Sequence, residues 1–285
     1  MTMRPLVIIG AGRSGTNMLR DTLTAIPGWA TWPCDEINLI WRHGNTNWPD
    51  DAIPPAAAGA ARPYVRRAFD RIQRATTASV IVEKTCANSL RVPYVDSIIP
   101  EARYLYLVRD GRDVTLSAMR RWTAGIEPAY LLRKLRFAPP GDIPHYALRF
   151  LENRWHQMRS TSRRQALWGP RFPGMNSYAA AHELVELCAR QWAECVLASD
   201  AAFSVMPQEK MFAIRYEEFV SDPGQILERL GQWYGEDVGS RVPRSALATI
   251  RDRGGSWRQS RDLFTDTALD VMAPVLKVHG YEPSS

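Results

Sequence analysis

Short apolar runs alternate with amphipathic stretches along most of this 285-residue chain. The runs are apolar on both faces, as strands are when helices cover both sides of a parallel sheet. We therefore expect an α/β fold with a parallel central sheet, whose strands lie at residues 5–9, 29–32, 79–82, 104–108 and 211–214. The amphipathic stretches predict flanking helices at residues 14–25, 111–122 and 225–234.

The pattern changes between about residue 122 and residue 201. Helical stretches there are rich in arginine and aromatic residues, and they are interrupted at Pro139-Pro140 and Gly169-Pro170. We expect a mostly helical, substrate-side insert above the carboxyl edge of the sheet, where open α/β sheets bind their ligands. Residues 44–61, with three prolines and an alanine run, are expected to form a long loop. The whole chain, 1–285, is then a single domain.

The net charge of +6, carried mostly by arginine, favours anionic ligands. The basic residues do not gather into one run and no recognised nucleic-acid module appears, so we expect no nucleic-acid partner. Four cysteines without metal-site spacing predict reduced thiols, no bound metal and a cytoplasmic location. The first apolar run is too short for a signal peptide. The sequence contains no run of about 18 apolar residues, so we expect no membrane span.

A glycine-rich turn follows the first expected strand and precedes the first expected helix. Its sequence is Gly10-Ala11-Gly12-Arg13-Ser14-Gly15-Thr16. Glycines allow backbone N–H groups to approach phosphate oxygens, and the positive end of a helix dipole adds to the attraction. The turn therefore predicts a phosphate-binding loop.

Three other interpretations of this turn have to be weighed. A P-loop kinase motif needs lysine and then serine or threonine after its second glycine, whereas this chain has Thr16 and Asn17. The turn also satisfies the G-x-G-x-x-G pattern of dinucleotide sites, with Asp35 about twenty residues further on. However, Asp35 does not end a clear apolar strand, and Arg13 adds a charge that such a site does not require. The third interpretation is a turn that binds no ligand.

Two segments together resemble the sulfotransferases that use the sulfate donor PAPS (3′-phosphoadenosine 5′-phosphosulfate). The Arg-Ser-Gly-Thr core of the turn is similar to the family's 5′-phosphosulfate loop. Residues 107–117 look like its 3′-phosphate motif, in which an arginine at a strand end precedes a helix serine by eight residues. A guanidinium binds phosphate through paired hydrogen bonds. The alternative for Arg109 is a surface ion pair with Asp110 or Asp113.

Two weaker likenesses extend the resemblance to about residue 260. Residues 215–223 are similar to a late strand-to-helix segment of the family, and residues 254–258 to a loop that closes on the nucleotide, where Arg253 is an alternative contact to Arg258. The resemblance implies a P-loop-NTPase-like fold, closer to the bacterial and Golgi-type branches than to the cytosolic type. It implies donor contacts at Gly12, Arg13, Ser14, Gly15, Thr16, Asn17, Arg109, Ser117, Trp257 and Arg258.

The cationic residues expected at the reaction centre are Arg13 and Lys84. Cytosolic-type members have lysine where this chain has Arg13, and arginine is better suited to an electrostatic clamp than to an acid. Lys84 is one of only four lysines and ends an expected strand in Val82-Glu-Lys-Thr-Cys86. Both cations would stabilise the transferring group. The alternative for Lys84 is an ion pair with Glu83.

The resemblance places a histidine base of the cytosolic type where this chain has Cys86, so the base must come from elsewhere. Glu36 is the expected general base, because Golgi-type and several bacterial members carry a glutamate base in this segment. Asp35 is the competitor, and its alternative role is to cap a helix at residues 38–41. His43 is expected to be a loop residue.

The expected reaction is transfer of the sulfuryl group from PAPS to a hydroxyl or amine, which leaves PAP and needs no metal. The acceptor is expected to be a small molecule, a lipid or a carbohydrate. An acceptor platform could come from the aromatic residues Trp41, Trp48, Trp122, Tyr130, Phe137, Trp155 and Trp168, although core packing explains them equally well. Arg133, Lys134 and Arg136 could touch an anionic acceptor or membrane headgroups, with a solvated helix face as the alternative. The remaining alternative functions are a P-loop-type small-molecule kinase and another nucleotide-binding protein.

Overall fold

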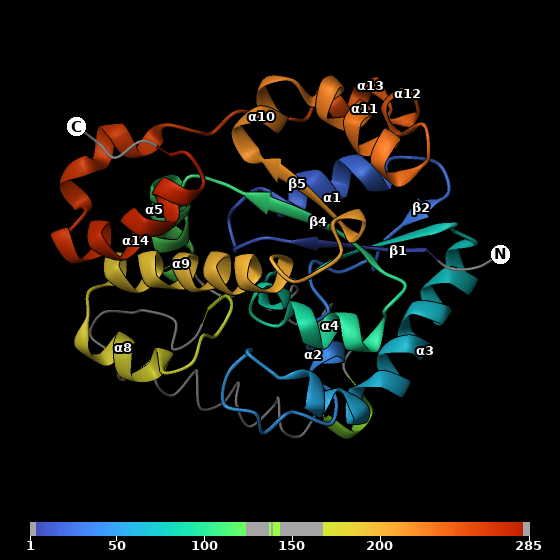
Figure 1. The fold of residues 1–285 in the computed structure, drawn as a ribbon, viewed down its shortest axis with the longest axis horizontal. Coiled ribbons are helices and arrows are strands. Elements are labelled where there is room, and N and C mark those ends of the chain that lie inside the picture. Colours follow the sequence, from blue (N-terminus) through green and yellow to red (C-terminus); the bar gives the residue numbers. More distant parts are fainter. Residues whose placement is uncertain (1–3, 124–136, 138, 143–167, 282–285) are drawn as a thin grey trace.

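A five-stranded parallel sheet forms the centre of the molecule (Figure 1). The computed structural model describes residues 4–123, 137, 139–142 and 168–281. The strands are β1 (Arg4–Ile9), β2 (Trp29–Ala30), β3 (Val80–Lys84), β4 (Arg103–Val108) and β5 (Met211–Arg215). They lie close to the five apolar runs, which confirms the expected α/β fold class.

The strand order β2-β3-β1-β4-β5 puts β1 at the centre, hydrogen-bonded to β3 on one side and β4 on the other. A dinucleotide-binding fold has β1 beside β2 instead. The topology therefore excludes the dinucleotide interpretation of the glycine turn. All the parallel strands end at the same edge, which brings the segments after β1, β3 and β4 together.

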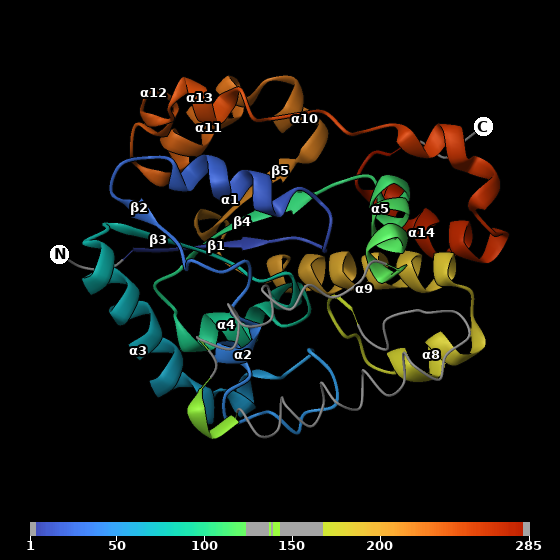
Figure 2. The same ribbon diagram turned by 180° about the vertical axis from the view of Figure 1, so that it is seen from behind.

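Helices cover both faces of the sheet. On one face lie α1 (Thr16–Thr24), α10 (Tyr216–Ser221), α11 (Pro223–Tyr234), α12 (Val238–Arg241) and α13 (Arg244–Leu247) (Figure 1). On the other face lie α2 (Asn38–Trp41), α3 (Ala58–Thr76), α4 (Val92–Ile98) and α9 (Leu184–Phe203) (Figure 2). The remaining described helices are α5 (Gly111–Thr123), α8 (Met175–Ala181), α14 (Asp266–Val278), and the 3₁₀ turns Pro55–Ala57, Cys86–Leu90, Pro140–Asp142, Gln208–Lys210 and Ser256–Leu263.

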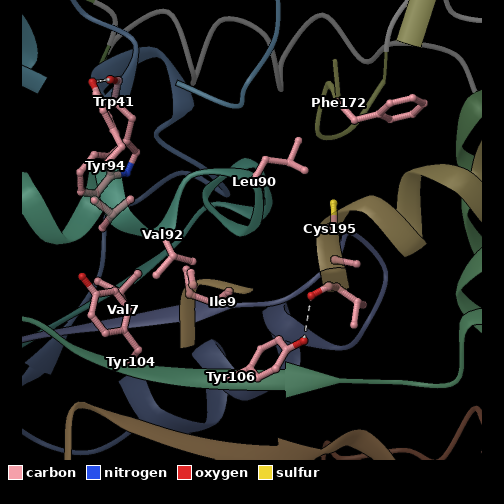
Figure 3. Close-up of a cluster of buried hydrophobic side chains, with 14 of the residues drawn as sticks. Val7, Ile9, Trp41, Leu90, Val92, Tyr94, Tyr104, Tyr106, Phe172 and Cys195 are labelled. Atoms are coloured by element: carbon pink, nitrogen blue, oxygen red, sulfur yellow. Dashed lines mark hydrogen bonds between the residues drawn. The ribbon is translucent and has the colours of Figure 1, made fainter. Parts of the chain in front are cut away.

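Two apolar cores result, one on each face of the sheet. Leu6 and Ile8 of β1 pack with Leu19 of α1 and Leu227 of α11. The neighbouring β1 side chains point to the opposite face, because side chains alternate along a strand. Figure 3 shows that second core around β1 and β4. Its labelled members are Val7, Ile9, Trp41, Leu90, Val92, Tyr94, Tyr104, Tyr106, Phe172 and Cys195.

The expected loop at residues 44–61 is wrong from residue 55 onward. A 3₁₀ turn at Pro55–Ala57 leads directly into α3, which begins at Ala58. Proline is favoured at a helix start, and Ala61, Val65 and Phe69 follow at helical spacing and are buried. The prolines here mark the beginning of a helix.

About half of the insert expected at about residues 122–201 lies outside the described residues, and with it Arg133, Lys134 and Arg136. Within its described part, α9 packs against α5 and α14 and contributes Trp192, Cys188 and Cys195 to the core. This part of the segment belongs to the body of the fold. In the part of the chain that the structure describes, no helix is both long and apolar enough to cross a membrane.

Candidate active site

The glycine turn joins β1 to α1 at the carboxyl edge of the sheet. Gly15 adopts a left-handed conformation with φ of 92°, and a Cβ atom on it would lie 2.6 Å from the ring of Tyr216. A Cβ on Gly10 would lie 2.7 Å from the carbonyl oxygen of Leu107. Only glycine fits both positions, so the sequence of the turn dictates its close approach to β4 and α10.

The polar groups of the turn are left available for a ligand. The Ser14 hydroxyl is buried and has no hydrogen-bond partner among the described residues. The helix α1 begins at Thr16, and no side chain caps its N-terminal N–H groups. Gly12 is half-buried, while Arg13 and Asn17 are exposed. Free backbone donors and a helix N-terminus favour an anion at this position.

Arg109 and Ser117 both lie against the turn, as their spacing predicts. Arg13 Nε donates to Ser117 Oγ at 3.0 Å. Arg109 is 6% exposed, and its two terminal nitrogens donate to the carbonyl oxygens of Arg13 at 3.2 Å and Arg253 at 2.5 Å. Its Nε is buried without a partner among the described residues, and the guanidinium carbon lies 4.1 Å above the Tyr216 ring. Arg109 therefore links the turn to the C-terminal segment.

The alternative ion pair of Arg109 with Asp110 or Asp113 is wrong. Asp110 binds the guanidinium of Arg112, with Oδ2 to Nη2 at 2.8 Å. The carboxylate of Asp113 accepts from the C-terminal loop, which leaves Arg109 without a carboxylate partner in the described structure. A buried guanidinium that has no carboxylate partner favours the binding of an anionic ligand.

The C-terminal loop at residues 254–258 packs onto the start of α5. Asp113 accepts hydrogen bonds from Gly255 N at 2.6 Å, Ser256 Oγ at 2.8 Å and Trp257 N at 3.0 Å. Trp257 is buried, with the guanidinium of Arg112 3.8 Å from its ring centroid and that of Arg258 at 5.0 Å. The sequence predicted this loop but missed the role of Asp113, because its partners are more than 140 residues away.

Positive charge accumulates around Arg13. The Arg13 side chain remains accessible to solvent, yet neighbouring groups partly desolvate its guanidinium. This desolvation, followed by the nearby guanidinium of Arg121, lowers the pKa of Arg13 from its ordinary value, and Arg109 and Arg120 act in the same direction. Neighbouring cations repel one another, which disfavours their charged forms, and an anion bound between them relieves this repulsion. The turn, Arg109 and α5 together form a cationic site.

Lys84 ends β3 and lies beside the segment that contains Asp35 and Glu36. Its Nζ is 3.0 Å from Glu36 Oε1 and 3.2 Å from Asp35 Oδ1. Burial opposes the charge of Lys84, yet Glu36 and then Asp35 hold the pKa of its ammonium above the ordinary value. The alternative pairing of Lys84 with Glu83 is wrong, because adjacent strand residues point to opposite faces. Lys84 is therefore a permanent cation at neutral pH.

The two neighbouring carboxylates differ in their partners. Asp35 Oδ1 accepts from Arg20 at 2.9 Å as well as from Lys84. Burial opposes its charge, but Lys84 and then Arg20 hold the pKa of Asp35 well below its usual range. Glu36 Oε1 accepts from Lys84 and, at 3.4 Å, from the backbone N–H of Cys86. The role of Asp35 as a helix cap is wrong, because α2 is preceded by Ile37 without a side-chain cap.

Cys86, at the position where the resemblance implies a histidine, cannot act as a base. Burial, and then the charge of Glu36, raises the pKa of its thiol to about 12. Its sulfur lies 3.7 Å from Thr16 Oγ1 in the phosphate-binding turn. Cys86 thus joins the two halves of the site as a neutral side chain.

Glu83 is a fully buried carboxyl group that the sequence did not single out. Burial raises its pKa to about 7, although Thr85 and Trp41 donate hydrogen bonds to it. The sequence did contain a signal of this buried group, because Glu83 is a second charged residue, beside Lys84, in an otherwise apolar strand.

This pKa predicts a pH-dependent stability. The folded protein holds the proton of Glu83 up to about pH 7, whereas the unfolded chain releases it near pH 4.5. Wild type should therefore lose about 3 kcal/mol relative to Glu83→Gln as the pH rises from about 4 to about 8, since one pKa unit equals about 1.4 kcal/mol. Urea unfolding of both proteins across this range measures the difference. A difference that does not change with pH would contradict the raised pKa.

The other predicted candidates lie in several places, and of these Trp168 is beside the turn, since a Cβ atom on Gly12 would lie 3.6 Å from its ring. His43 follows α2, and its Nδ1 is 2.9 Å from Asp142 Oδ2. Trp41 and Trp122 are core residues, and Trp168 packs against the core, while Tyr130 and Trp155 lie outside the described residues. Among the described residues, no group of three or more His, Cys, Asp and Glu side chains could hold a metal ion.

Comparison with known proteins identifies the family. The model of the sulfotransferase family matches residues 5–164, which is more than half of the chain. The protein therefore belongs to the sulfotransferase family. No curated protein sequence matches the chain.

Solved structures show the same fold. The sulfotransferase STF9 from Mycobacterium avium is 14% identical and superimposes with a TM-score of 0.57, covering 98% of this chain and 77% of that one. The sulfotransferase domain of the Synechococcus PCC 7002 olefin synthase is 13% identical, with a TM-score of 0.56 and coverage of 99% and 96%. A sulfotransferase from Alicyclobacillus acidocaldarius is 17% identical, with a TM-score of 0.50 and coverage of 97% of both chains.

Proposed function

We propose that the protein transfers the sulfuryl group of PAPS to a hydroxyl or amine of a small-molecule, lipid or carbohydrate acceptor. One observation carries this proposal. Of the buried polar atoms that lack partners among the described residues, Ser14 Oγ lies in the turn and Arg109 Nε beside it, and these two match the two phosphate contacts that the resemblance implies. Buried polar groups normally have a hydrogen-bond partner, so a nucleotide with two separate anionic groups fits this site.

In this proposal the turn from Gly12 to Asn17 binds the 5′-phosphosulfate end of the donor. Arg109 and Ser117 bind its 3′-phosphate, and the loop with Trp257 and Arg258 covers the nucleotide. The contacts of Arg109 with both the turn and residue 253 support this division, because one guanidinium touches both segments. Ser117 would exchange its bond from Arg13 for a phosphate oxygen.

When bound, PAPS supplies a sulfuryl group attached to a phosphate that can leave. Lys84 and Arg13 stabilise the negative charge on the sulfuryl oxygens and on the departing phosphate. Lys84 suits this role because its pKa is raised and its ammonium remains charged. No step in this reaction requires a metal ion.

Glu36 is the proposed general base. It takes the proton from the acceptor hydroxyl while the acceptor oxygen forms its bond to sulfur and the sulfur–phosphate oxygen bond breaks, releasing PAP. One contact favours Glu36 over Asp35, because Lys84 binds both carboxylates whereas Arg20 additionally binds Asp35. Arg20 and Lys84 both bind Asp35 and lower the pKa of its carboxyl, which makes Asp35 a weak proton acceptor.

Thermal unfolding with nucleotides tests the proposed donor directly. PAP without magnesium should stabilise the protein, by about 2.7 kcal/mol at a hundred times its dissociation constant. Adenosine lacks both phosphates and should not stabilise it at the same concentration. Stabilisation only by magnesium-ATP would instead favour a kinase or another nucleotide-binding protein. The single-domain organisation of residues 1–285, the cytoplasmic location, peripheral membrane contact and the absence of a nucleic-acid partner remain predictions.

A further inference from the structure

The backbone immediately after Glu36 is anchored by Thr85. The Ile37 N–H donates to Thr85 Oγ1 at 3.2 Å, and Thr85 is completely buried. Thr85 directly follows Lys84, the residue that pairs with Glu36. Lys84 and Thr85, two adjacent residues at the end of β3, therefore hold the side chain of Glu36 and the backbone amide that follows it.

Glu83 fixes the direction of the Thr85 hydroxyl. Thr85 Oγ1 donates to Glu83 Oε1 at 2.6 Å, so that its lone pairs remain for the N–H of Ile37. Glu83 lies on the face of β3 that carries Ile81, opposite to Lys84. A hydroxyl whose proton is engaged in this way can only accept a bond from Ile37.

Glu83 also holds the far end of the same segment. Trp41 Nε1 donates to Glu83 Oε1 at 3.2 Å, and the backbone oxygen of Trp41 accepts from Tyr94 at 2.6 Å (Figure 3). The other carboxylate oxygen accepts from Asn88 Nδ2 at 3.0 Å. Asn88 in turn binds Arg91 Nε at 2.9 Å.

The chain of contacts returns to the segment through Arg91. This fully buried arginine donates to Asn38 Oδ1 at 2.5 Å. Trp41 thus binds Glu83 directly, Ile37 is connected to it through Thr85, and Asn38 through Arg91 and Asn88. One buried network centred on Glu83 therefore holds the short stretch that begins with Glu36.

We propose that Thr85, oriented by Glu83, is a positioning residue that fixes Glu36 for proton transfer by holding the Ile37 amide. This inference rests on the proposed function, in which Glu36 is the base. The nucleotide contacts lie elsewhere, at the turn and Arg109, so the positioning role concerns turnover and not donor binding. Displacement of a catalytic group by about 1 Å can reduce a rate by about a hundredfold.

Thr85→Val tests the proposal, because valine has the shape of threonine and lacks the hydroxyl. PAP release from PAPS is measured with the best acceptor of a panel of phenols, alkyl alcohols and amino sugars. We expect kcat to fall at least about tenfold, while the affinity for PAP stays within about twofold. Thr85→Ser keeps the hydroxyl and should retain kcat within about threefold. Wild-type kcat in Thr85→Val would overturn the proposal.

A double variant separates positioning from general damage. If Thr85 acts through Glu36, then Thr85→Val should not lower the residual rate of Glu36→Gln any further. Thr22→Val is the matched control, since Thr22 is also a buried threonine and its hydroxyl donates to the Met18 carbonyl of its own helix. It should leave kcat unchanged. An additional loss in the double variant would show a merely structural role and overturn the proposal.

Hydrogen exchange at the Ile37 amide provides a readout that needs no activity. Thr85→Val should exchange this proton at least about tenfold faster than wild type, and Thr85→Ser should not. Unchanged exchange in Thr85→Val would show that Thr85 does not hold the amide and would overturn the proposal. Failure of the proposed function looks different: wild type would neither bind PAP nor release it from PAPS. That result would overturn the base role as well, whereas the exchange experiment would still show whether Thr85 holds the segment.

Discussion

Glu36→Gln should lower the rate of sulfuryl transfer by about 10²–10⁴ while the affinity for PAP stays within about twofold. Glutamine keeps the size of the side chain and an oxygen for Lys84 and the Cys86 N–H, but it cannot take a proton. The change therefore removes the proposed base and leaves the phosphate contacts in place. Transfer of labelled sulfate from PAPS measures the rate, and calorimetric titration with PAP measures the affinity.

Asp35→Asn is the matched control for this experiment. It removes one negative charge from the same segment and from the same lysine. Because the pKa of Asp35 is already lowered by Lys84 and Arg20, we expect its loss to reduce turnover much less. Full activity of Glu36→Gln would show that Glu36 is not the base. A larger loss of activity in Asp35→Asn than in Glu36→Gln would assign that role to Asp35.

Arg109→Ala should weaken PAP binding by about 1.5–3 kcal/mol or more, the range for hydrogen bonds to charged groups. This corresponds to about a tenfold to hundredfold rise in the dissociation constant. The proposed reason is the loss of a buried guanidinium whose Nε has no partner among the described residues. Titration with adenosine 5′-phosphate, which lacks the 3′-phosphate, should show a much smaller difference between wild type and variant.

Two further variants separate binding from folding in this test. Arg103→Ala removes an arginine at the opposite end of β4, which also donates to backbone carbonyls, and it should leave PAP affinity unchanged. Arg109→Lys keeps the charge but loses the planar fork, so its affinity should lie between wild type and alanine. An Arg109→Ala protein that folds and binds PAP normally would show that the 3′-phosphate is held elsewhere.

The positions of the strands and of the phosphate-binding turn could be predicted from the sequence, because both depend on local chemistry. Apolar runs such as the one that ends at Ile9 have to be buried on both faces of a sheet. Gly10 and Gly15 stand where any larger side chain would collide with β4 or α10. Arg109 and Ser117 could be placed at the phosphate site because residues 107–117 resemble the 3′-phosphate motif of the family.

The helices α3 and α14 were not predicted, and both contain a proline. Pro63 and Pro274 remove one backbone hydrogen bond each and argue against a helix locally. Packing outweighs this cost: α14 buries Met272 and Val275 against α9, and α3 buries Phe69 beside Trp41. Tertiary burial of an amphipathic face overrides a weak local preference.

The sequence by itself determined the fold class, the turn and the set of charged residues from which the site is built. Only the tertiary structure decided that Asp35 is bound by two cations, because Arg20 and Lys84 come from α1 and β3. The same applies to Asp113, to Glu83 and to Thr85, whose partners lie on other elements. Periodicity and motifs follow from neighbours along the chain, whereas the state of a buried charge depends on the groups that folding brings around it.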